Sequence, residues 1–169
     1  MASKGLSSAA TDLETRVTDE DHQALKLWLR LLSCTNLISG EIRRRLRGKF
    51  GTTLARFDLM AQLERAPKGL RMSELSKRLM VSSGNVTGLT DSLEAEGMVR
   101  RVADPSDRRA YLVELTPQGR EVFREMAQVH EVWITELFEG LSREDKQALY
   151  DLLGKLKRSL VEKGRLWRV

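Results

Sequence analysis

The stretch from Arg71 to Thr116 limits what this chain can fold into more than any other part of the sequence. Leu75 and Leu79 stand four residues apart and give residues 73–80 one apolar helical stripe. After a short break, apolar residues recur at helical spacing across residues 82–96. Two helices joined by so tight a turn predict a helix-turn-helix, whose second helix can enter a DNA major groove about 12 Å wide.

The second of these helices has one face of small polar side chains. Ser82 is the expected N-cap, and no bulky side chain on this face prevents a close approach to a surface. Asn85 is the expected base-reading residue, because its amide can pair bidentately with adenine. Ser83 and Thr87 would meet base edges or phosphates, the glycines would let the backbone lie close, and the cations before the turn would hold phosphates. The DNA-contacting residues predicted from both helices are Lys77, Arg78, Ser82, Ser83, Gly84, Asn85, Thr87 and Gly88.

A basic hairpin follows the two helices, with runs of strand-forming residues on either side of the turn-like, charged residues 103–109. Arg109 is the predicted minor-groove probe, because an arginine held extended suits a narrow, strongly negative groove. Asp107 would orient it through a charge-assisted hydrogen bond, and Arg108 would bind the flanking phosphate. A hairpin after a helix-turn-helix makes a winged helix, and the segment near Leu70 can add a short extra strand.

Residues 70–97 and 104–119, above all the run DPSDRRA followed by LTPQG, resemble the MarR family of bacterial transcriptional regulators. The similarity extends over residues 24–160, with helices on both sides of the winged helix as in that family. This resemblance implies a homodimeric regulator that binds a pseudo-palindromic operator and is released by a small ligand or by oxidation. A repressor is expected, since members of the family usually are.

Three further helices carry apolar stripes: one over residues 19–48 and two after the hairpin. The first helix after the hairpin begins with Thr116 as N-cap and Pro117 as first helical residue. The stripe of the first helix consists of Trp28, Leu31, Leu32, Ile38, Ile42 and Leu46. Three such helices exceed what a winged helix can cover, so we expect a homodimer interface. The alternative is that they pack only within one chain.

The expected fold is mainly α with a small β-hairpin, in the order α-α-α-α-β-β-α-α. Residues 1–18 are small and polar and predict a mobile arm. Residues 19–50 would form a helix of the dimerisation module, 51–116 the winged helix-turn-helix DNA-binding domain, and 117–169 the C-terminal helices of the dimerisation module.

A run of cations near the end of the first helix, including Arg43 and Arg44, suggests an anion site. Phe57 and Met60 of the next helix could line an effector cleft there. The alternatives are that these cations complement the helix C-terminus and that the two apolar residues are core. The first two helices resemble those of relatives that respond to aromatic acids or their coenzyme A thioesters, which suggests a small amphipathic effector of that kind.

The composition favours a cytoplasmic protein with a polyanionic partner. The net charge is +5 and the pI about 9.6. One cysteine excludes an internal disulfide framework, no apolar run approaches the ~20 residues that span a bilayer, and no secretory signal opens the chain. There is no glycine-rich phosphate loop, and His22 and His130 are the only histidines. We therefore expect no metal site, no cofactor and no enzyme activity.

Two other functions remain open at this stage. Cys34 could make the protein a redox-sensing regulator, although its place between Leu32 and Leu37 is typical of a buried, inert thiol. A winged-helix protein-interaction adaptor is the other alternative, and it would leave the exposed arginines of the hairpin without a role.

Overall fold

The structure is a computed structural model that describes residues 22–162, so the arm expected over residues 1–18 lies outside the described residues. The expected order of elements is confirmed, including the short extra strand. The elements are α1 (Gln23–Phe50), α2 (Leu54–Glu64), β1 (Leu70–Arg71), α3 (Met72–Leu79), α4 (Ser83–Ala95), β2 (Val99–Asp104), β3 (Asp107–Leu115), α5 (Pro117–Leu137) and α6 (Arg143–Glu162). Contacts divide the chain into two units, with the boundary inside α1 between Glu41 and Ile42.

The core of the second unit is built from one face of each of its central helices. Leu75 of α3 and Val86 of α4 are fully buried, as is Leu63 of α2. The apolar stripes that the sequence predicted for these helices therefore face inward. Behind them, Val99 and Val113 cover the inner side of the sheet.

The sheet has the strand order β1-β3-β2, and its strands are antiparallel. Leu70 lies opposite Val113, and the β2–β3 ladder continues outward until the register shifts at Ala103. The sequence predicted a loop over residues 103–109, but the strands continue further, to Asp104 and from Asp107. The tip is shorter than expected because its backbone closes in a tight turn that is held by hydrogen bonds to the side chain of Asp104.

The junction between the hairpin and α5 is closely packed. Thr116 caps α5 as expected: its hydroxyl accepts the N–H of Gly119 at 2.9 Å and donates to the carbonyl of Gly97 at 2.7 Å. A Cβ on Gly119 would lie 1.9 Å from the carbonyl oxygen of Met98. This close approach requires glycine, and it fixes the position of the start of α5 against the hairpin.

Two helices keep their apolar stripes uncovered in the single chain. The buried residues of α1 are Ile42 and Leu46, and α6 has none. Cys34, expected from its neighbours to be buried, is exposed. The exposed large apolar residues of the two helices are Leu25, Leu27, Trp28, Leu32, Leu37, Leu149, Tyr150, Leu152, Leu153, Leu156, Leu160 and Val161. Among the described residues, no helix is long and apolar enough to cross a bilayer.

Replacing Gly119 by alanine should destabilise the protein by about 1–3 kcal/mol, because the new methyl group would press on backbone atoms that cannot rotate away. Urea unfolding of the full chain measures this. Gly88→Ala is the matched control: nothing lies within 4 Å of its Cβ position, so it should leave the free energy of unfolding unchanged or raise it by up to about 1 kcal/mol. Equal stability of the two variants would contradict the close packing at Gly119.

Candidate nucleic-acid interface

The polar face of α4 is exposed and the opposite face is buried. The Ser82 hydroxyl accepts the N–H of Asn85 at 3.4 Å and caps the helix as expected. The Thr87 hydroxyl donates to the carbonyl of Ser83 at 3.0 Å, so it is already partly engaged within the helix. Nothing lies within 4 Å of the Cβ positions of the two glycines. The exposed residues of this face are Ser82, Ser83, Gly84, Asn85, Thr87 and Gly88.

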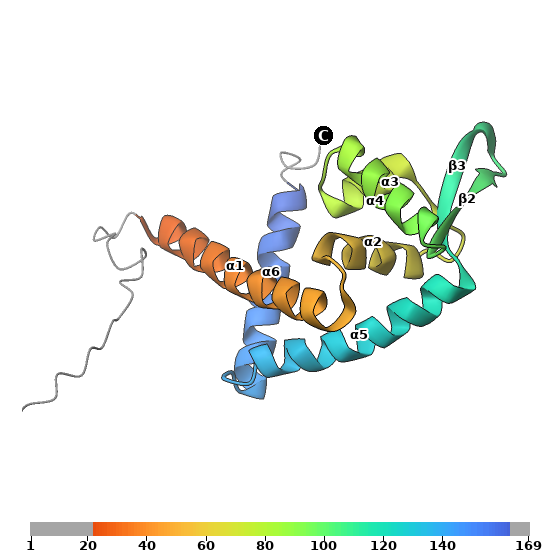
Figure 1. The fold of residues 1–169 in the computed structure, drawn as a ribbon. Coiled ribbons are helices and arrows are strands. Elements are labelled where there is room, and N and C mark those ends of the chain that lie inside the picture. Colours follow the sequence, from red (N-terminus) through yellow and green to blue (C-terminus); the bar gives the residue numbers. More distant parts are fainter. Residues whose placement is uncertain (1–21, 163–169) are drawn as a thin grey trace, which may run out of the picture. The chain divides into compact units, whose positions relative to one another are not determined.

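The end of α3 contributes two exposed cations, Lys77 and Arg78, immediately before the turn into α4. The turn is tight because Met80 ends α3 in the left-handed conformation, with φ of 56°. The Ser76 hydroxyl donates to the carbonyl of Val81 at 2.7 Å and fixes the chain after the turn. The two cations and the exposed face thus belong to adjacent helices, α3 and α4, and both helices contact the hairpin (Figure 1).

The tip of the hairpin is closed by Asp104, which is only 6% exposed. Its Oδ1 accepts both the N–H and the hydroxyl of Ser106, at 2.8 and 2.7 Å. Its Oδ2 accepts from Nε of Arg71 at 2.7 Å, which links the hairpin to the start of α3. The hydrogen bonds from Ser106, followed by that from Arg71, lower the pKa of Asp104 to about 2. No local pattern in the sequence indicates the long-range partner, which lies 33 residues earlier in the chain.

Asp107 acts on the backbone of the tip and not, as expected, on the guanidinium group of Arg109. Its Oδ1 accepts the backbone N–H of Arg109 at 3.0 Å, and its Oδ2 lies 3.9 Å from Nη2 of Arg71. The side chain of Arg109 is exposed. The side chain of Arg108 lies outside the described part of the structure.

Arg101 connects the hairpin to α4. Its Nη2 lies 2.5 Å from the Asp91 carboxylate, its Nη1 pairs with Glu94, and its backbone N–H donates to Glu94 at 3.1 Å. Because Asp91 and Glu94 lie on α4, these contacts fix the orientation of the hairpin relative to that helix. Sequence reasoning missed this role. The one signal in the sequence is that successive residues of a strand face opposite sides. This alternation puts the neighbouring Arg100 on the other face of β2, where it pairs with Glu114.

Arg43 and Arg44, proposed from the sequence as an effector site, do line one cleft. The cleft has a volume of about 520 Å³, and its lining residues are Arg43, Arg44, Arg47, Thr52, Thr53, Leu54 and Ala55. The two apolar residues expected there do not line it. Phe57 is 6% exposed and packs at a tilt against the rings of Phe123 and His130, at centroid distances of 5.4 and 4.7 Å, while Met60 is 2% exposed. Both belong to the core instead.

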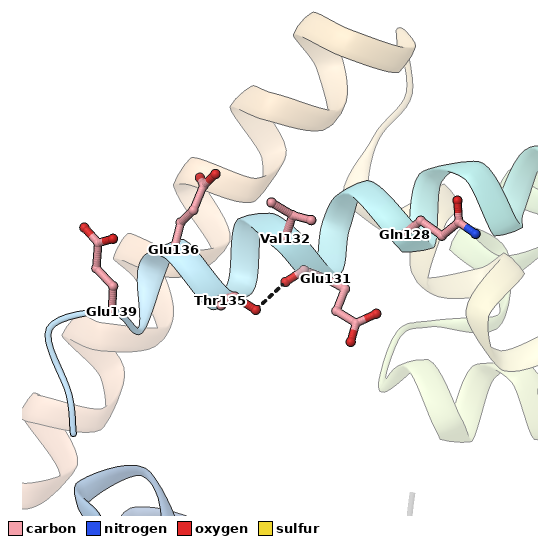
Figure 2. Close-up of a pocket in the computed structure, with 6 residues that line it drawn as sticks. All are labelled: Gln128, Glu131, Val132, Thr135, Glu136 and Glu139. Atoms are coloured by element: carbon pink, nitrogen blue, oxygen red, sulfur yellow. Dashed lines mark hydrogen bonds between the residues drawn. The ribbon is translucent and has the colours of Figure 1, made fainter. Parts of the chain in front are cut away.

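A second cavity, of about 370 Å³, lies along α5 and is acidic. Figure 2 shows its lining side chains along α5, among them Glu131 and Glu136, with Glu139 in the turn that follows the helix. Glu136 pairs with Arg45 at 2.5 Å. The described residues contain no group of three His, Cys, Asp or Glu side chains that could hold a metal ion. These carboxylates would repel a nucleic acid, so this cavity is not part of the candidate interface.

Comparison with known proteins gives consistent matches. A family model described as MarR family matches residues 52–111. The crystal structure of a MarR family transcriptional regulator from Silicibacter pomeroyi matches 85% of this chain and 99% of that one, with a TM-score of 0.71 and 33% identity. A mutant MarR from E. coli, solved in complex with operator DNA, matches over 82% and 99% of the chains, with a TM-score of 0.70 and 26% identity.

Curated relatives match over shorter segments. The transcriptional activatory protein BadR of Rhodopseudomonas palustris is 35% identical over 62% of this chain and 61% of its own length. The matched segments of three Bacillus subtilis regulators, YfiV, YdgJ and YkoM, cover 57%, 66% and 55% of those proteins. The chain therefore spans little more than half to two thirds of these curated relatives.

Asp104 makes the stability of the hairpin tip depend on pH. Its pKa is about 2 in the folded protein against an ordinary value of 3.8, so its charged form stabilises the fold above about pH 4 and this contribution is lost as the pH falls toward 2. The difference in melting temperature between the wild type and Asp104→Asn should therefore shrink between about pH 4 and pH 2. Glu121→Gln, at an exposed position of α5, should follow the wild type throughout. A difference that stays constant down to pH 2 would show that the Asp104 charge does not hold the turn.

Proposed function

The chain belongs to the MarR family of transcriptional regulators, and we propose on this premise that it binds double-stranded operator DNA as a homodimer and represses transcription until a small effector releases it. The observation that carries the proposal is that the exposed face of α4 has only small polar side chains and that the ion pairs of Arg101 hold a basic hairpin beside this helix. The protein would act in the cytoplasm, on a pseudo-palindromic site.

In this proposal α4 enters the major groove with its N-terminal half. Asn85 reads an adenine, and Ser83 contacts a base edge or phosphate through its exposed hydroxyl. Thr87 does the same with its remaining acceptor capacity, since its hydrogen already bonds within the helix. Gly84 and Gly88 have open space around them, which supports a close approach of the helix backbone to the DNA.

The hairpin tip would enter the adjacent minor groove with Arg109, where the narrow groove concentrates negative potential. Asp107 supports this by fixing the backbone from which Arg109 projects. Arg108 would bind the flanking phosphate. Lys77 and Arg78 would hold the backbone from the end of α3, supplying affinity without sequence preference.

Homodimerisation would cover the apolar faces that the single chain leaves exposed. Leu149, Leu153, Leu156 and Leu160 recur at helical spacing along α6 and are each 37–40% exposed. A continuous apolar stripe of this length is unusual on the surface of a monomer. A two-fold pair would also place two α4 helices on one DNA face, about 34 Å apart.

The effector in this proposal is a small amphipathic anion, an aromatic acid or its coenzyme A thioester, bound in the cleft lined by Arg43 and Arg44. A ligand that binds the DNA-incompetent state a hundredfold better would supply about 2.7 kcal/mol, enough to release an operator. The cleft is preferred over a redox switch at Cys34 because it gathers cations around a cavity, whereas exposure alone does not make a thiol reactive.

Repression needs a direct test, because one relative, BadR, is named an activatory protein. A reporter gene that falls silent when the regulator is deleted would overturn repression.

Arg109→Ala should weaken binding to the DNA upstream of the protein's own gene by about 1–3 kcal/mol, because the minor-groove contact is lost. Gel-shift titration measures this. Lys77→Ala is the comparison: it removes a phosphate contact and should lower the slope of log affinity against log salt by about 1, while weakening binding to all sequences alike. Wild-type affinity in the Arg109→Ala protein would remove the hairpin from the interface.

Leu153→Glu should raise the dissociation constant of the dimer by at least about tenfold, since the carboxylate would have to be buried in the apolar interface. Analytical ultracentrifugation over a concentration series measures the shift. Gln147→Glu adds the same charge on the opposite side of α6 and should leave the dimer intact. Equal behaviour of the two variants, or a wild type that is monomeric throughout, would contradict the dimer.

A further inference from the structure

Met80 is the residue at which α3 ends and the chain turns toward α4. In the described part of the chain it is the one residue other than glycine with a positive φ, which is 56° with a ψ of 36°. This left-handed conformation is unfavourable for a residue that has a Cβ atom, and glycine or asparagine usually occupies such a position after a helix. The chain therefore places methionine where the backbone favours a smaller residue.

The side chain of Met80 is also 71% exposed, although it is large and apolar. Single apolar side chains on a surface are common, but this one combines exposure with an unfavourable backbone conformation. Neither the core nor the backbone benefits from a methionine side chain at this position. The combination favours a role in a contact outside the chain.

Hydrogen bonds hold the backbone around Met80 in one conformation. Its N–H donates to the carbonyl of Lys77 at 3.3 Å, and the N–H of Val81 donates to the carbonyl of Ser76 at 3.3 Å. The Ser76 hydroxyl in turn donates to the carbonyl of Val81 at 2.7 Å. The Met80 side chain thus projects from a backbone that is already ordered, so little backbone entropy is lost when it contacts a ligand.

Met80 lies between two groups of residues that would contact DNA. Lys77 and Arg78, three and two residues earlier, are exposed and would hold phosphates. Ser82 and Ser83, two and three residues later, begin the helix that would enter the major groove. Consecutive Cα atoms are about 3.8 Å apart, so the Cα atom of Met80 lies within about 8 Å of that of Ser82. A duplex that meets both groups therefore passes close to Met80.

The major groove offers one apolar group on its base edges, the C5 methyl group of thymine. If Asn85 reads an adenine, the thymine paired with that adenine places its methyl group in the same groove. Methionine is unbranched and polarisable, and it adapts to small apolar surfaces. A thymine methyl group therefore matches the chemistry of Met80 at the place where this side chain is exposed.

We propose that Met80 packs against a thymine methyl group in each half of the operator and is a specificity-determining residue of this regulator. The inference rests on the proposed function, because it presumes that a two-fold pair of α4 helices reads DNA. Lys77 and Arg78 would give affinity without sequence preference. Met80 adds a preference for A·T pairs at the position that it contacts.

The test compares two forms of the duplex upstream of the protein's own gene, one with thymidine and one with every thymidine replaced by deoxyuridine. The replacement removes the C5 methyl groups and keeps the hydrogen bonds of the base pairs and the phosphates. Burying one methyl group is worth about fourfold in affinity, so two half-sites should give about fifteenfold. In gel-shift titration the wild type should bind the deoxyuridine duplex more weakly by about this factor.

The variants show whether Met80 carries the preference. The ratio of the two dissociation constants should be at least about fivefold smaller for Met80→Gly than for the wild type. Met80→Leu keeps an apolar side chain and should keep a ratio of at least about fivefold. Val132→Ala shortens another exposed apolar side chain, on α5, and should keep the wild-type ratio.

Stability should change in the opposite direction from binding. Glycine relieves the left-handed conformation, so the melting temperature of Met80→Gly should equal that of the wild type or exceed it by about 1–3 °C. The same variant should bind the thymidine duplex at least about fivefold more weakly. A variant that is more stable and binds more weakly cannot owe its loss of binding to unfolding.

Three outcomes would overturn the inference and leave the proposed function standing. The first is an equal ratio for the wild type and Met80→Gly, whether or not the variant binds both duplexes more weakly. The second is a loss of the ratio in Met80→Leu, since an apolar contact would then not explain it. The third is a melting temperature of Met80→Gly that falls by several degrees, which would make Met80 a structural residue. A wild type that binds neither duplex would refute the proposed function, and this inference with it.

Discussion

The ion pairs of Arg101 with Asp91 and Glu94 are the interaction on which the DNA-facing surface depends. The buried face of α4 packs against the other helices of the helix-turn-helix. A two-stranded hairpin has little core of its own and is marginally stable in isolation. Arg101 fixes the hairpin to α4, and the bond from Arg71 to Asp104 fixes its tip to α3. The two elements that would contact DNA are thereby held in one geometry before any DNA is present, which lowers the entropy lost on binding.

Much of this architecture follows from local sequence patterns. Helical spacing predicted the inner face of α4, including Val86 and Leu93. The capping residues Ser82 and Thr116 could be predicted because capping depends on neighbours within a few positions. The alternation of strand-forming residues predicted the hairpin but not the length of its strands. The tip turned out tighter than expected because Asp104 bonds to Ser106, a local detail that the charged composition of the segment obscured.

What the sequence could not provide are the long-range polar pairs and the exposure of α1. Arg56 finds Glu96 forty residues later in the chain, and no spacing rule relates them. Phe57 and Met60 were assigned to the effector cleft by their position after the basic run, yet burial places both in the core. Cys34 was expected to be buried because its neighbours are apolar, but apolar neighbours on a helix are covered only if another surface is there to cover them. The same uncovered apolar faces of α1 and α6 are the reason to expect a second copy of the chain.

In the proposed complex, a two-fold pair of chains sets two α4 helices in successive major grooves, with an Arg109 in the minor groove beyond each. Hydroxyl-radical footprinting of the protein on the DNA upstream of its own gene tests this most directly. The predicted result is a pattern symmetric about one centre, with the two major-groove regions about 34 Å apart on one face of the duplex and weaker protection in the flanking minor grooves. A single protected half-site at saturating protein, or protection spread evenly around the duplex, would contradict it.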